Sequence, residues 1–392
     1  MTEWETYKLG DVVNILDNRR IPLSAREREQ RHGEYPYYGA QGIIDYVDDY
    51  LFDGTYLLIA EDGENLRSKK QNIAQLVSGK YWVNNHAHIL ESNGLCDIRY
   101  ICYLLNIIDI SGYITGSAQP KLNQANLLAI SISLPSLEEQ RRIAGILGAI
   151  DDKIVNNRRI NTNLELQAQA LYKQWFVDFE FPNEEGKPYK SSGGKMVDSK
   201  LGQIPEGWSV GDIYKYVNVV YGAPYKSVLF NERKDGNPLI RIRDLKTFSP
   251  QYYTQEILPN TEFINTGDVV AGMDAEFVPC LWMGEKGVLN QRCCKFVGKQ
   301  DSISNYYVMF LVKPELEFVQ SYKTGTTVSH LGKADIDKFV VVQPSFAVIE
   351  KFSKIADALL NNKIKLAKEN ITLATLRDTL LPKLMNGEIK TE

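Results

Sequence analysis

Side chains that could contact nucleic acid are concentrated in short loops of this chain. Arginine, lysine, asparagine and glutamine are the residues that hydrogen-bond base edges and hold phosphates. In the first half they occur in "YPYYGAQG" (35–42), "EDGENLRSKK" (61–70) and "SAQPKLNQ" (117–124). The candidate DNA contacts in these loops are Tyr38, Gln41, Asn65, Arg67, Lys69, Lys70, Gln119, Lys121 and Asn123.

The second half contains loops of the same kind in a comparable order. The candidates there are Tyr221, Lys226, Arg241, Arg243, Asn290, Arg292, Thr326 and His330. For any one residue, an ordinary solvated loop is the favoured interpretation. The recurrence of similar loops at matching places in both halves favours a shared binding role.

Sequence motifs of catalysis were sought and not found. The chain has no phosphate-binding Gly-x-x-x-x-Gly-Lys-Ser/Thr loop, because "GGKM" at Gly193 lacks both the spacing and the hydroxyl. It has no glycine-rich nucleotide fingerprint, no Asn-Pro-Pro-Tyr type of motif for a flipped adenine, and no Gly-x-Ser-x-Gly elbow. We therefore predict a protein that is not an enzyme and binds no cofactor.

Metal-ligating residues are sparse as well. His86 and His88 form a His-x-His pair, and the simplest interpretation is a strand with both imidazoles on one face, since no third ligand is nearby. The cysteines are Cys96, Cys102, Cys280, Cys293 and Cys294, an odd number without Cys-x-x-Cys. This pattern argues against a disulfide framework and a zinc site, and it favours a reduced cytoplasm.

The bulk composition is that of a globular protein. The 392 residues suffice for two or three domains, and no apolar run is long enough to span a membrane. The start, "MTEWETYKLGD", has acids where a signal peptide needs bases. The net charge of −4 argues against tight non-specific DNA binding by the chain alone. A local basic groove, or a basic partner, remains compatible with that charge.

An internal repeat organises the chain. Thr115 begins "TGSAQPKLNQANLLAISISLPS", and Thr324 begins "TGTTVSHLGKADIDKFVVVQPS". Both segments read Thr-Gly, a polar loop, a leucine, an alternating apolar strand and Pro-Ser. Earlier in each half, "WETYKLGDVVNI" parallels "IPEGWSVGDIYKYV". The sequence therefore predicts one structural unit built twice.

A long helix is predicted after each Pro-Ser. Ser136 and Glu139 form a capping box, whereas Val348 removes the box after Ser345. The first apolar seam comprises Ile143, Leu147, Ile150, Ile154, Leu164, Ala168, Leu171 and Trp175, broken by Asn157 and Asn161. The second comprises Phe352, Ile355, Leu359, Leu366, Leu373, Leu376 and Leu380, broken by Asn362 and Glu369. Such narrow stripes bury little alone, so each helix is the expected partner of the other.

The remaining segments are short apolar or alternating runs typical of strands. We predict an α+β fold with two mostly-β domains and two long coiled-coil helices. The predicted boundaries are 1–134 for the first domain, 135–181 for the first helix, 182–200 for a polar linker, 201–344 for the second domain and 345–392 for the second helix.

Over nearly its whole length, the chain resembles the DNA-specificity subunit of type I restriction–modification systems. The most specific stretch is "GSAQPKLNQANLLAISISLPSLEEQRRIAGILGAIDDKI" from Gly116, with its echo from Gly325. "LGD" at Leu9, "YLLIAEDGENL" at Tyr56, "RIRDL" at Arg241 and the closing "LRDTLLPKLMNGEI" also resemble the family. The second copy departs from the pattern, because "SHLGKADI" replaces the Gln-Pro-Lys-Leu-Asn loop.

The resemblance implies two target-recognition domains joined by antiparallel helices and related by a pseudo-two-fold axis. Each domain would read one half of a gapped double-stranded DNA target, including an adenine that the partner extrudes. The helices would set the gap and dock two adenine methyltransferase subunits. S-adenosylmethionine, ATP and Mg would belong to those subunits and to a restriction translocase/nuclease subunit. A non-catalytic coiled-coil scaffold and a single-chain methyltransferase remain as alternatives.

Overall fold

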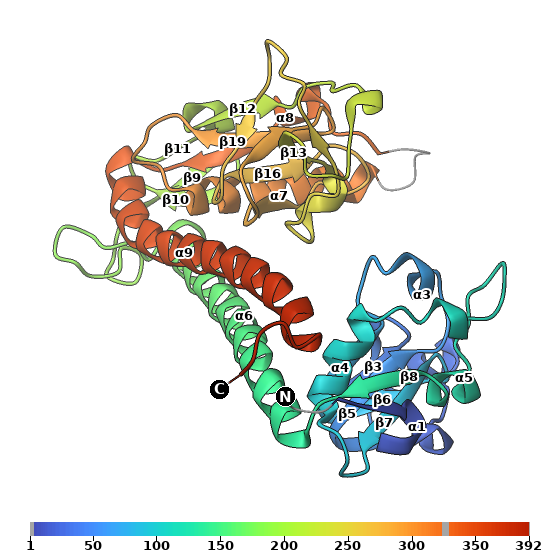
Figure 1. Ribbon diagram of the computed structural model, residues 1–392. Helices are drawn as coiled ribbons and strands as arrows, with labels where there is room; N and C mark the ends of the chain where they lie inside the picture. The colour runs from blue at the N-terminus through green and yellow to red at the C-terminus, as the bar shows by residue number, and fades with distance from the viewer. Residues whose placement is uncertain (1–3, 324–328, 392) are drawn as a thin grey trace. The chain divides into compact units, whose positions relative to one another are not determined.

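The computed structural model describes residues 4–323 and 329–391. Two compact units make up the fold (Figure 1). Unit 1 contains Met1–Asp152 and Ala374–Glu392, and unit 2 contains Lys153–Leu373. Two long helices, α6 (Leu137–Tyr172) and α9 (Phe346–Met385), each contribute to both units. Within the described residues, no helix has both the length and the apolar character needed to cross a membrane.

Unit 1 is built on a six-stranded sheet in the order β2-β7-β5-β6-β3-β4. Its strands are β2 (Val13–Ile15), β3 (His32–Gly39), β4 (Gly42–Val47), β5 (Phe52–Ala60), β6 (Ala74–Val83) and β7 (Ala87–Ser92). β3 and β6 are parallel, and the other neighbouring strands are antiparallel. Helix α4 (Ile98–Ile107) packs on β5 and β6, and its buried face contributes Tyr100, Ile101 and Leu104 to the core.

Shorter elements complete unit 1. They are β1 (Glu5–Lys8), β8 (Ser131–Leu134), α1 (Leu9–Val12), α2 (Ala25–Gln30), α3 (Asn65–Ser68) and α5 (Gln124–Leu128). β1 pairs with β8, which confirms the strand expected in "LLAISISLP". Leu384 and Met385, near the end of α9, are buried in the same core as Leu147 of α6. Burying a leucine completely contributes about 1.5–3 kcal/mol, so these contacts anchor both helices to the unit.

Unit 2 contains two four-stranded sheets. The first has the order β12 (Val217–Tyr221), β19 (Cys293–Gly298), β16 (Val269–Gly272) and β17 (Pro279–Leu281). The second has the order β14 (Tyr253–Thr254), β13 (Asn237–Ile240), β18 (Gly287–Leu289) and β15 (Phe263–Ile264). β11 (Ser209–Asp212) pairs with β20 (Val340–Gln343), as β1 pairs with β8 in unit 1. This pairing confirms the strand predicted in "KFVVVQP".

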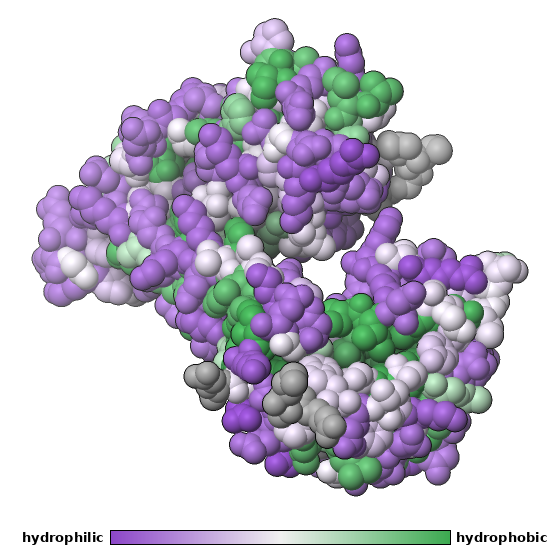
Figure 2. Space-filling model, in the orientation of Figure 1, coloured by the Kyte–Doolittle hydropathy of each residue, from purple (hydrophilic) through white to green (hydrophobic). Residues whose placement is uncertain are grey.

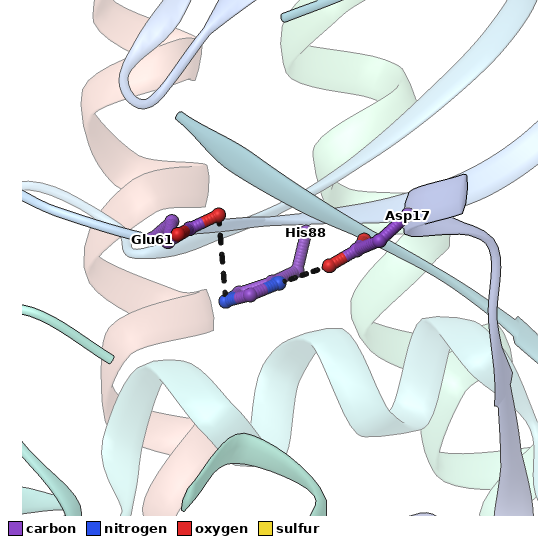
Figure 3. Close-up of side chains that lie close together, drawn as sticks. All are labelled: Asp17, Glu61 and His88. Carbon is purple, nitrogen blue, oxygen red and sulfur yellow. Dashed lines mark hydrogen bonds and ion pairs between the residues drawn. The ribbon is translucent and has the colours of Figure 1, made fainter. Parts of the chain in front are cut away.

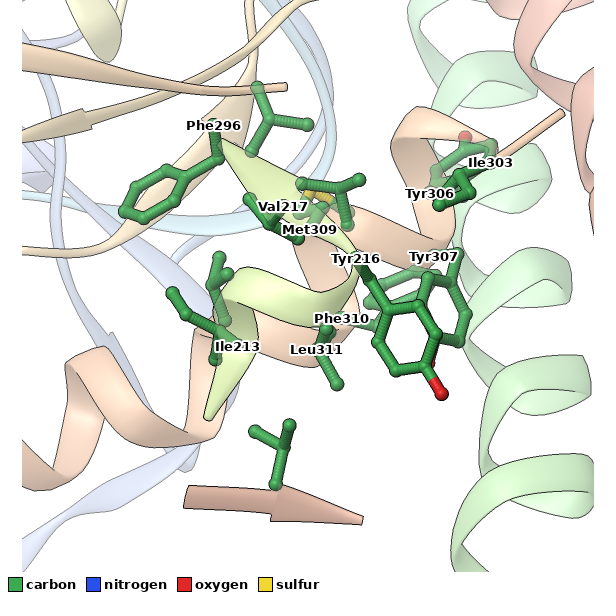
Figure 4. Packing of buried hydrophobic residues seen from close by; sticks show 14 of the residues in the cluster. Ile213, Tyr216, Val217, Phe296, Ile303, Tyr306, Tyr307, Met309, Phe310 and Leu311 are labelled. Atoms are coloured by element: carbon green, nitrogen blue, oxygen red, sulfur yellow. The ribbon is translucent and has the colours of Figure 1, made fainter. Parts of the chain in front are cut away.

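The core of unit 2 is aromatic. Helix α7 (Asn305–Lys323) packs on the first sheet and contributes Tyr306, Tyr307 and Phe310 to this core, and Tyr307 lies close to Tyr216 (Figure 4). Phe352 of α9 joins them at an edge-to-face distance of 6.3 Å from Tyr307. Aromatic pairs at such distances add stabilisation beyond burial alone. The start of α9 is therefore part of this core as well as part of a helix pair.

Residues 182–200, for which the sequence predicts a linker, contain regular structure. β9 (Met196–Ser199) pairs with β10 (Gly202–Pro205). Tyr189 stacks on Phe181 with 4.7 Å between ring centres. One exposed part of this segment is the turn around Gly186, where φ is +76°.

Ion pairs and hydrogen bonds show that the two long helices are antiparallel partners. In unit 2, Asn157 of α6 hydrogen-bonds Glu369 of α9 at 2.9 Å. In unit 1, Asp151 of α6 pairs with Arg377 of α9 at 2.9 Å. Asp151 precedes Asn157 on α6, whereas its partner Arg377 follows Glu369 on α9. The two helices therefore run in opposite directions. The expected fold class, with paired long helices and repeated mostly-β domains, is confirmed.

The seam differs in detail from the predicted one. On α6 the structure buries Ile143, Leu147, Ile154, Ala168 and Trp175 and half-buries Ile150, Leu164 and Leu171. On α9 it buries Phe352 and half-buries Leu359, Leu366, Leu373 and Leu380. The assignment of Ile355 and Leu376 to the seam is wrong, because their side chains are 47% and 45% exposed. Ala356, Leu360 and Lys363 are buried instead, since the first half of α9 also packs on the core of unit 2.

The cap predicted for α6 is partly confirmed. The Ser136 hydroxyl accepts a hydrogen bond from the Glu139 amide at 3.3 Å. The Glu139 carboxylate does not complete a capping box, because it pairs with Arg142 at 3.2 Å and accepts a hydrogen bond from the Thr391 hydroxyl at 2.7 Å. This last contact ties the start of α6 to the chain beyond α9 within unit 1.

The surface is mainly polar. On the face drawn in Figure 2, hydrophilic residues dominate both units, and hydrophobic residues gather in separate patches. Exposed isoleucines include Ile43 and Ile44 on β4, the edge strand of the unit 1 sheet. Such mixed surfaces are ordinary for folded proteins, so the patches by themselves indicate no particular ligand.

Candidate nucleic-acid interface

Three separate segments of unit 1 meet in one group of loops. We call Asp62, His86 and Lys121 the first loop cluster. Asp62 follows β5, His86 lies in the turn between β6 and β7, and Lys121 lies in the loop that begins at Thr115. Backbone hydrogen bonds hold these segments together: the Glu61 amide donates to the His86 carbonyl at 2.9 Å, and the Leu122 amide donates to the Glu61 carbonyl at 2.8 Å.

The side chains of the first loop cluster are half-exposed and paired with acids. His86 Nδ1 lies 2.7 Å from Asp62 Oδ2. Lys121 Nζ lies 3.2 Å from Glu61 Oε1, and the Lys121 side chain is 52% exposed. The His86 and Lys121 side chains keep hydrogen-bonding capacity on the solvent side, where an anionic ligand could approach.

Two more predicted contacts border the first loop cluster. The Arg67 guanidinium donates to the Gly116 and Ser117 carbonyls at 2.6 and 3.2 Å, so it holds the loop that leads to Lys121. Gln41 is exposed at the tip between β3 and β4. A methyl group added to Gly63 would lie 3.7 Å from Gln41 Nε2, so this tip is next to Asp62.

Unit 2 contains a second loop cluster, formed by Asp274, Arg292 and His330. Asp274 contacts both basic side chains: Arg292 Nη1 lies 2.9 Å from Oδ2, and His330 Nδ1 lies 2.7 Å from Oδ1. The side chains of Arg292 and His330 are 56% and 51% exposed. The structure therefore brings together two residues that the sequence analysis selected separately.

The two clusters share one backbone frame. The Met273 amide donates to the Arg292 carbonyl at 2.8 Å, and the Leu331 amide donates to the Met273 carbonyl at 2.7 Å. These bonds repeat the two described for Glu61, His86 and Leu122. The frame therefore equates Asp62 with Asp274, His86 with Arg292 and Lys121 with His330. The departure "SHLGKADI" changes the side chains of the second loop and leaves this frame intact.

Sequence reasoning missed Asp62, His86 and Asp274 as members of these clusters. A signal was present for one equivalence: Lys121 and His330 each lie six residues after the threonine that begins the repeated segment, Thr115 or Thr324. No comparable signal joins Asp274 to His330, because strand pairing brings them together across 56 residues.

A buried ionic network lies under the first loop cluster. His88 is 1% exposed and sits between Asp17 and Glu61 (Figure 3). Its Nδ1 is 2.5 Å from Asp17 Oδ2, and its Nε2 is 2.7 Å from the Leu122 carbonyl oxygen. Arg20 pairs with Asp17 at 3.0 Å and with Glu61 at 2.9 Å. This network connects the core of the sheet with the loop that carries Lys121.

The network corrects two expectations about the His-x-His pair. His86 lies in a turn, so the two imidazoles do not share one face of a strand. Asp17 and Glu61 are close enough to His88 to form a metal-ligand set with it, so the reasoning that no third ligand is nearby is wrong. Both ring nitrogens of His88 nevertheless face oxygen acceptors, and Arg20 pairs with both carboxylates. These contacts describe an ion-paired network in which each member already has a partner.

Glu61 links the network to the loop cluster. Burial alone would raise its pKa, but hydrogen bonds from Arg20 and Lys121 hold the pKa of Glu61 below its usual value. The carboxylate is therefore ionised at neutral pH and orients Lys121 from below. In chemical terms, the site offers positioned cations and amide groups, which suit binding of an anionic, hydrogen-bonding ligand.

Several other predicted contacts of unit 1 are occupied inside the protein. Asn65 is 6% exposed and donates to the Gln71 carbonyl at 2.7 Å. Asn123 caps α5 by accepting from the Asn126 amide at 2.9 Å. Tyr38 packs edge-on against Tyr81. Lys69, Lys70 and Gln119 are exposed, and Lys69 also donates to the Ile108 carbonyl.

Unit 2 shows the same division. Asn290 is 9% exposed and accepts from the Arg292 amide, and Tyr221 is half-buried with its pKa raised to about 12 by burial. Arg241 lies with Cζ 4.3 Å from the centre of the Tyr252 ring. Lys226 and Arg243 are exposed. The remaining candidate, Thr326, lies outside the described residues.

Comparison with known proteins identifies the repeated units. The family model for the type I restriction modification DNA specificity domain matches residues 1–166 and 205–374. The type I restriction enzyme MjaIX specificity subunit of Methanocaldococcus jannaschii is 25% identical, over 100% of this chain and 94% of that protein. The type I restriction enzyme HindI specificity subunit of Haemophilus influenzae is 20% identical, over 99% and 100% respectively.

The fold has a solved counterpart. The crystal structure of the type I restriction-modification S subunit from M. genitalium matches with a TM-score of 0.57 and 13% identity, covering 98% of this chain and 96% of that chain. At this identity the likeness concerns the fold alone. The family model, which matches both halves, establishes that the chain belongs to the family of DNA-specificity subunits of type I restriction–modification systems.

Proposed function

We propose that the chain reads a double-stranded DNA target divided into two halves, with unit 1 reading one half and unit 2 the other. The observation that carries this proposal is the pair of matched loop clusters. Asp62, His86 and Lys121 occupy the same backbone frame as Asp274, Arg292 and His330. A protein that reads two half-sites needs two equivalent surfaces, whereas a scaffold does not.

The chemical steps belong, in this proposal, to partner chains. Two adenine methyltransferase subunits dock on α6 and α9 and carry S-adenosylmethionine, and a translocase/nuclease subunit uses ATP and Mg. The support is that the sequence lacks motifs for methyl transfer or nucleotide binding, and that its relatives are named specificity subunits. The partners also supply phosphate contacts, which the net charge of −4 makes necessary.

Exchange of one domain tests the division of labour. Residues 1–134 are replaced with the matching region of a relative, and methylated adenines are sequenced in DNA of cells that carry the complete system. We expect one half of the methylated motif to change while the other half and the gap persist. The matched control replaces residues 201–344 and should change the opposite half. A change of both halves after one exchange would overturn the proposal.

A further inference from the structure

Two of the three ion pairs between the described parts of the two long helices share one polarity. In unit 2, Glu165 of α6 pairs with Lys363 of α9, whose side chain is only 9% exposed. In unit 1, Asp151 of α6 pairs with Arg377 of α9 at 2.9 Å. Arg377 lies fourteen residues after Lys363, and Asp151 lies fourteen residues before Glu165. Both pairs therefore follow one antiparallel register and are two heptads apart, with the acid on α6 and the base on α9.

The internal repeat makes this polarity informative. Thr115 and Thr324, and likewise Ser136 and Ser345, are 209 residues apart, so each α6 position has a counterpart on α9. The counterparts are Ala374 for Glu165, Ile154 for Lys363, Leu360 for Asp151 and Ala168 for Arg377. All four counterparts are apolar. The two helices thus occupy equivalent places in the repeat, but a charged seam residue on one helix corresponds to an apolar residue on the other.

Pairing of like helices would remove the partner of each charge across the seam, although Arg377 would keep its ion pair with Asp378 at 2.8 Å and Asp151 its hydrogen bond from the Tyr103 hydroxyl at 2.6 Å. If α6 paired in this register with α6 of a second copy, Glu165 would face Ile154, and Asp151 would face Ala168. If α9 paired with a second α9, Lys363 would face Ala374, and Arg377 would face Leu360. A buried charge without a partner is costly. Lys363 is the least exposed of the four, so the pairing of α9 with itself is the more strongly disfavoured.

The buried Asn157 favours the mixed pair over a pair of α9 helices but not over a pair of α6 helices, because Asn161 is the α6 counterpart of Asn370. Asn157 is fully buried and donates to Glu369 and Asn370 at 2.9 Å each, whereas its α9 counterpart is Leu366. Lys153 pairs with Glu369 at 3.4 Å, with the signs reversed and both side chains more exposed. A single buried polar residue in a helix seam is known to select partner and register.

We propose that these polar side chains select α9 as the partner of α6 and exclude the self-pairing that a duplicated helix would otherwise permit. The partner that the α6 seam fits is a helix with bases opposite Asp151 and Glu165. A second copy of α6 has the apolar residues Ala168 and Ile154 at those positions. The device keeps the two unlike halves of one chain together, and it does not depend on what ligand the loop clusters bind.

A nicked protein tests the selection directly. A protease site is inserted after Gly186, in the exposed turn, and the folded full chain is cleaved there. The two fragments are then unfolded together in urea and refolded, and their complexes are weighed by native mass spectrometry. We expect mixed complexes only, because each ion pair favours the mixed pair by roughly tenfold, or about 100-fold for two independent pairs.

The matched variant gives every charged position the residue of its counterpart: Asp151→Leu, Glu165→Ala, Lys363→Ile and Arg377→Ala. Its seam no longer distinguishes the helices, so complexes of like fragments should appear beside mixed ones. If the unchanged protein formed complexes of two identical fragments as often as mixed complexes, the proposal would be overturned. Exclusively mixed complexes in the variant would also overturn it, since the rest of the units would then be selecting the partner.

A double-mutant cycle on the intact chain gives a second readout that requires no refolding. Glu165→Lys and Lys363→Glu each place like charges opposite one another, and each should lower the melting temperature. The combined variant reverses the pair and should recover most of the loss. Simple addition of the two losses would show that the charges are not coupled, and the selection would lose its basis.

Discussion

The two loop clusters have the same backbone frame but different supports. Under the first, Glu61 and His88 belong to a buried ionic network with Asp17 and Arg20. Under the second, the equivalent positions are Met273 and Cys294, which are 6% and 0% exposed, and burial raises the pKa of the Cys294 thiol to about 12. The frame is therefore set by backbone hydrogen bonds, and either an ionic or an apolar interior can hold it in place.

The difference has consequences for how each unit fails. A buried network is worth little net stability, yet it becomes strongly destabilising when one partner is removed. An apolar interior loses stability in proportion to the atoms removed. The interior under the first loop cluster should consequently be sensitive to single charge deletions and to acid in a way that the interior under the second loop cluster is not. Three predictions sharpen this contrast.

The largest effect is expected for Arg20→Ala. The change leaves Asp17 and Glu61 buried without their shared cation, so unit 1 should lose about 3–5 kcal/mol of stability. Hydrogen-exchange mass spectrometry can locate the loss, which should appear in peptides of unit 1 and spare those of unit 2. Arg19→Ala is the control, because Arg19 is exposed and its contacts, a hydrogen bond to the Leu51 carbonyl and the face of the Phe52 ring at 4.7 Å, lie outside the network. Equal effects of the two changes would refute the importance of the network.

A smaller, pH-dependent effect is expected for Glu61→Gln. At neutral pH the loss of two charge-assisted hydrogen bonds should cost about 1.5–3 kcal/mol. Because folding lowers the pKa of Glu61, its contribution is present above the unfolded-state value and is lost as the pH falls through the folded value. The melting temperatures of the two proteins should therefore converge as the pH falls below about 4.5. Exposed Glu64→Gln serves as the control, and a gap that stays constant with pH would contradict the assignment.

The smallest effect concerns the equivalent cations of the two clusters. Lys121→Ala should weaken DNA binding by the assembled complex by about fivefold, the value of one exposed ionic contact, without changing base preference. The slope of log affinity against log salt should fall by about one if Lys121 holds a phosphate. His330→Ala tests the same position in unit 2. A changed half-site motif in either variant would instead assign that residue to base reading.

Local pattern was sufficient for much of the architecture. The repeat from Thr115 and Thr324, the strands β8 and β20, and the two long helices follow from periodicity within about 40 residues. Which face of α9 is buried could not be predicted from this periodicity, because the apolar pattern favours Ile355 whereas the fold buries Ala356. A helix that packs on two surfaces at once buries a face that no single stripe reveals.

The family and the repeated loops were accessible from sequence because they depend on residue order alone. The loop clusters were not, since His88 meets Asp17 across 71 residues and His330 meets Asp274 across 56. Asn65 and Asn123 show the converse: their side chains suit base contacts, but local hydrogen bonds occupy them. Residue type and spacing determine which side chains could bind a ligand. Only the tertiary structure decides which of them face solvent together, because strand pairing joins distant segments and burial consumes the hydrogen bonds of the rest.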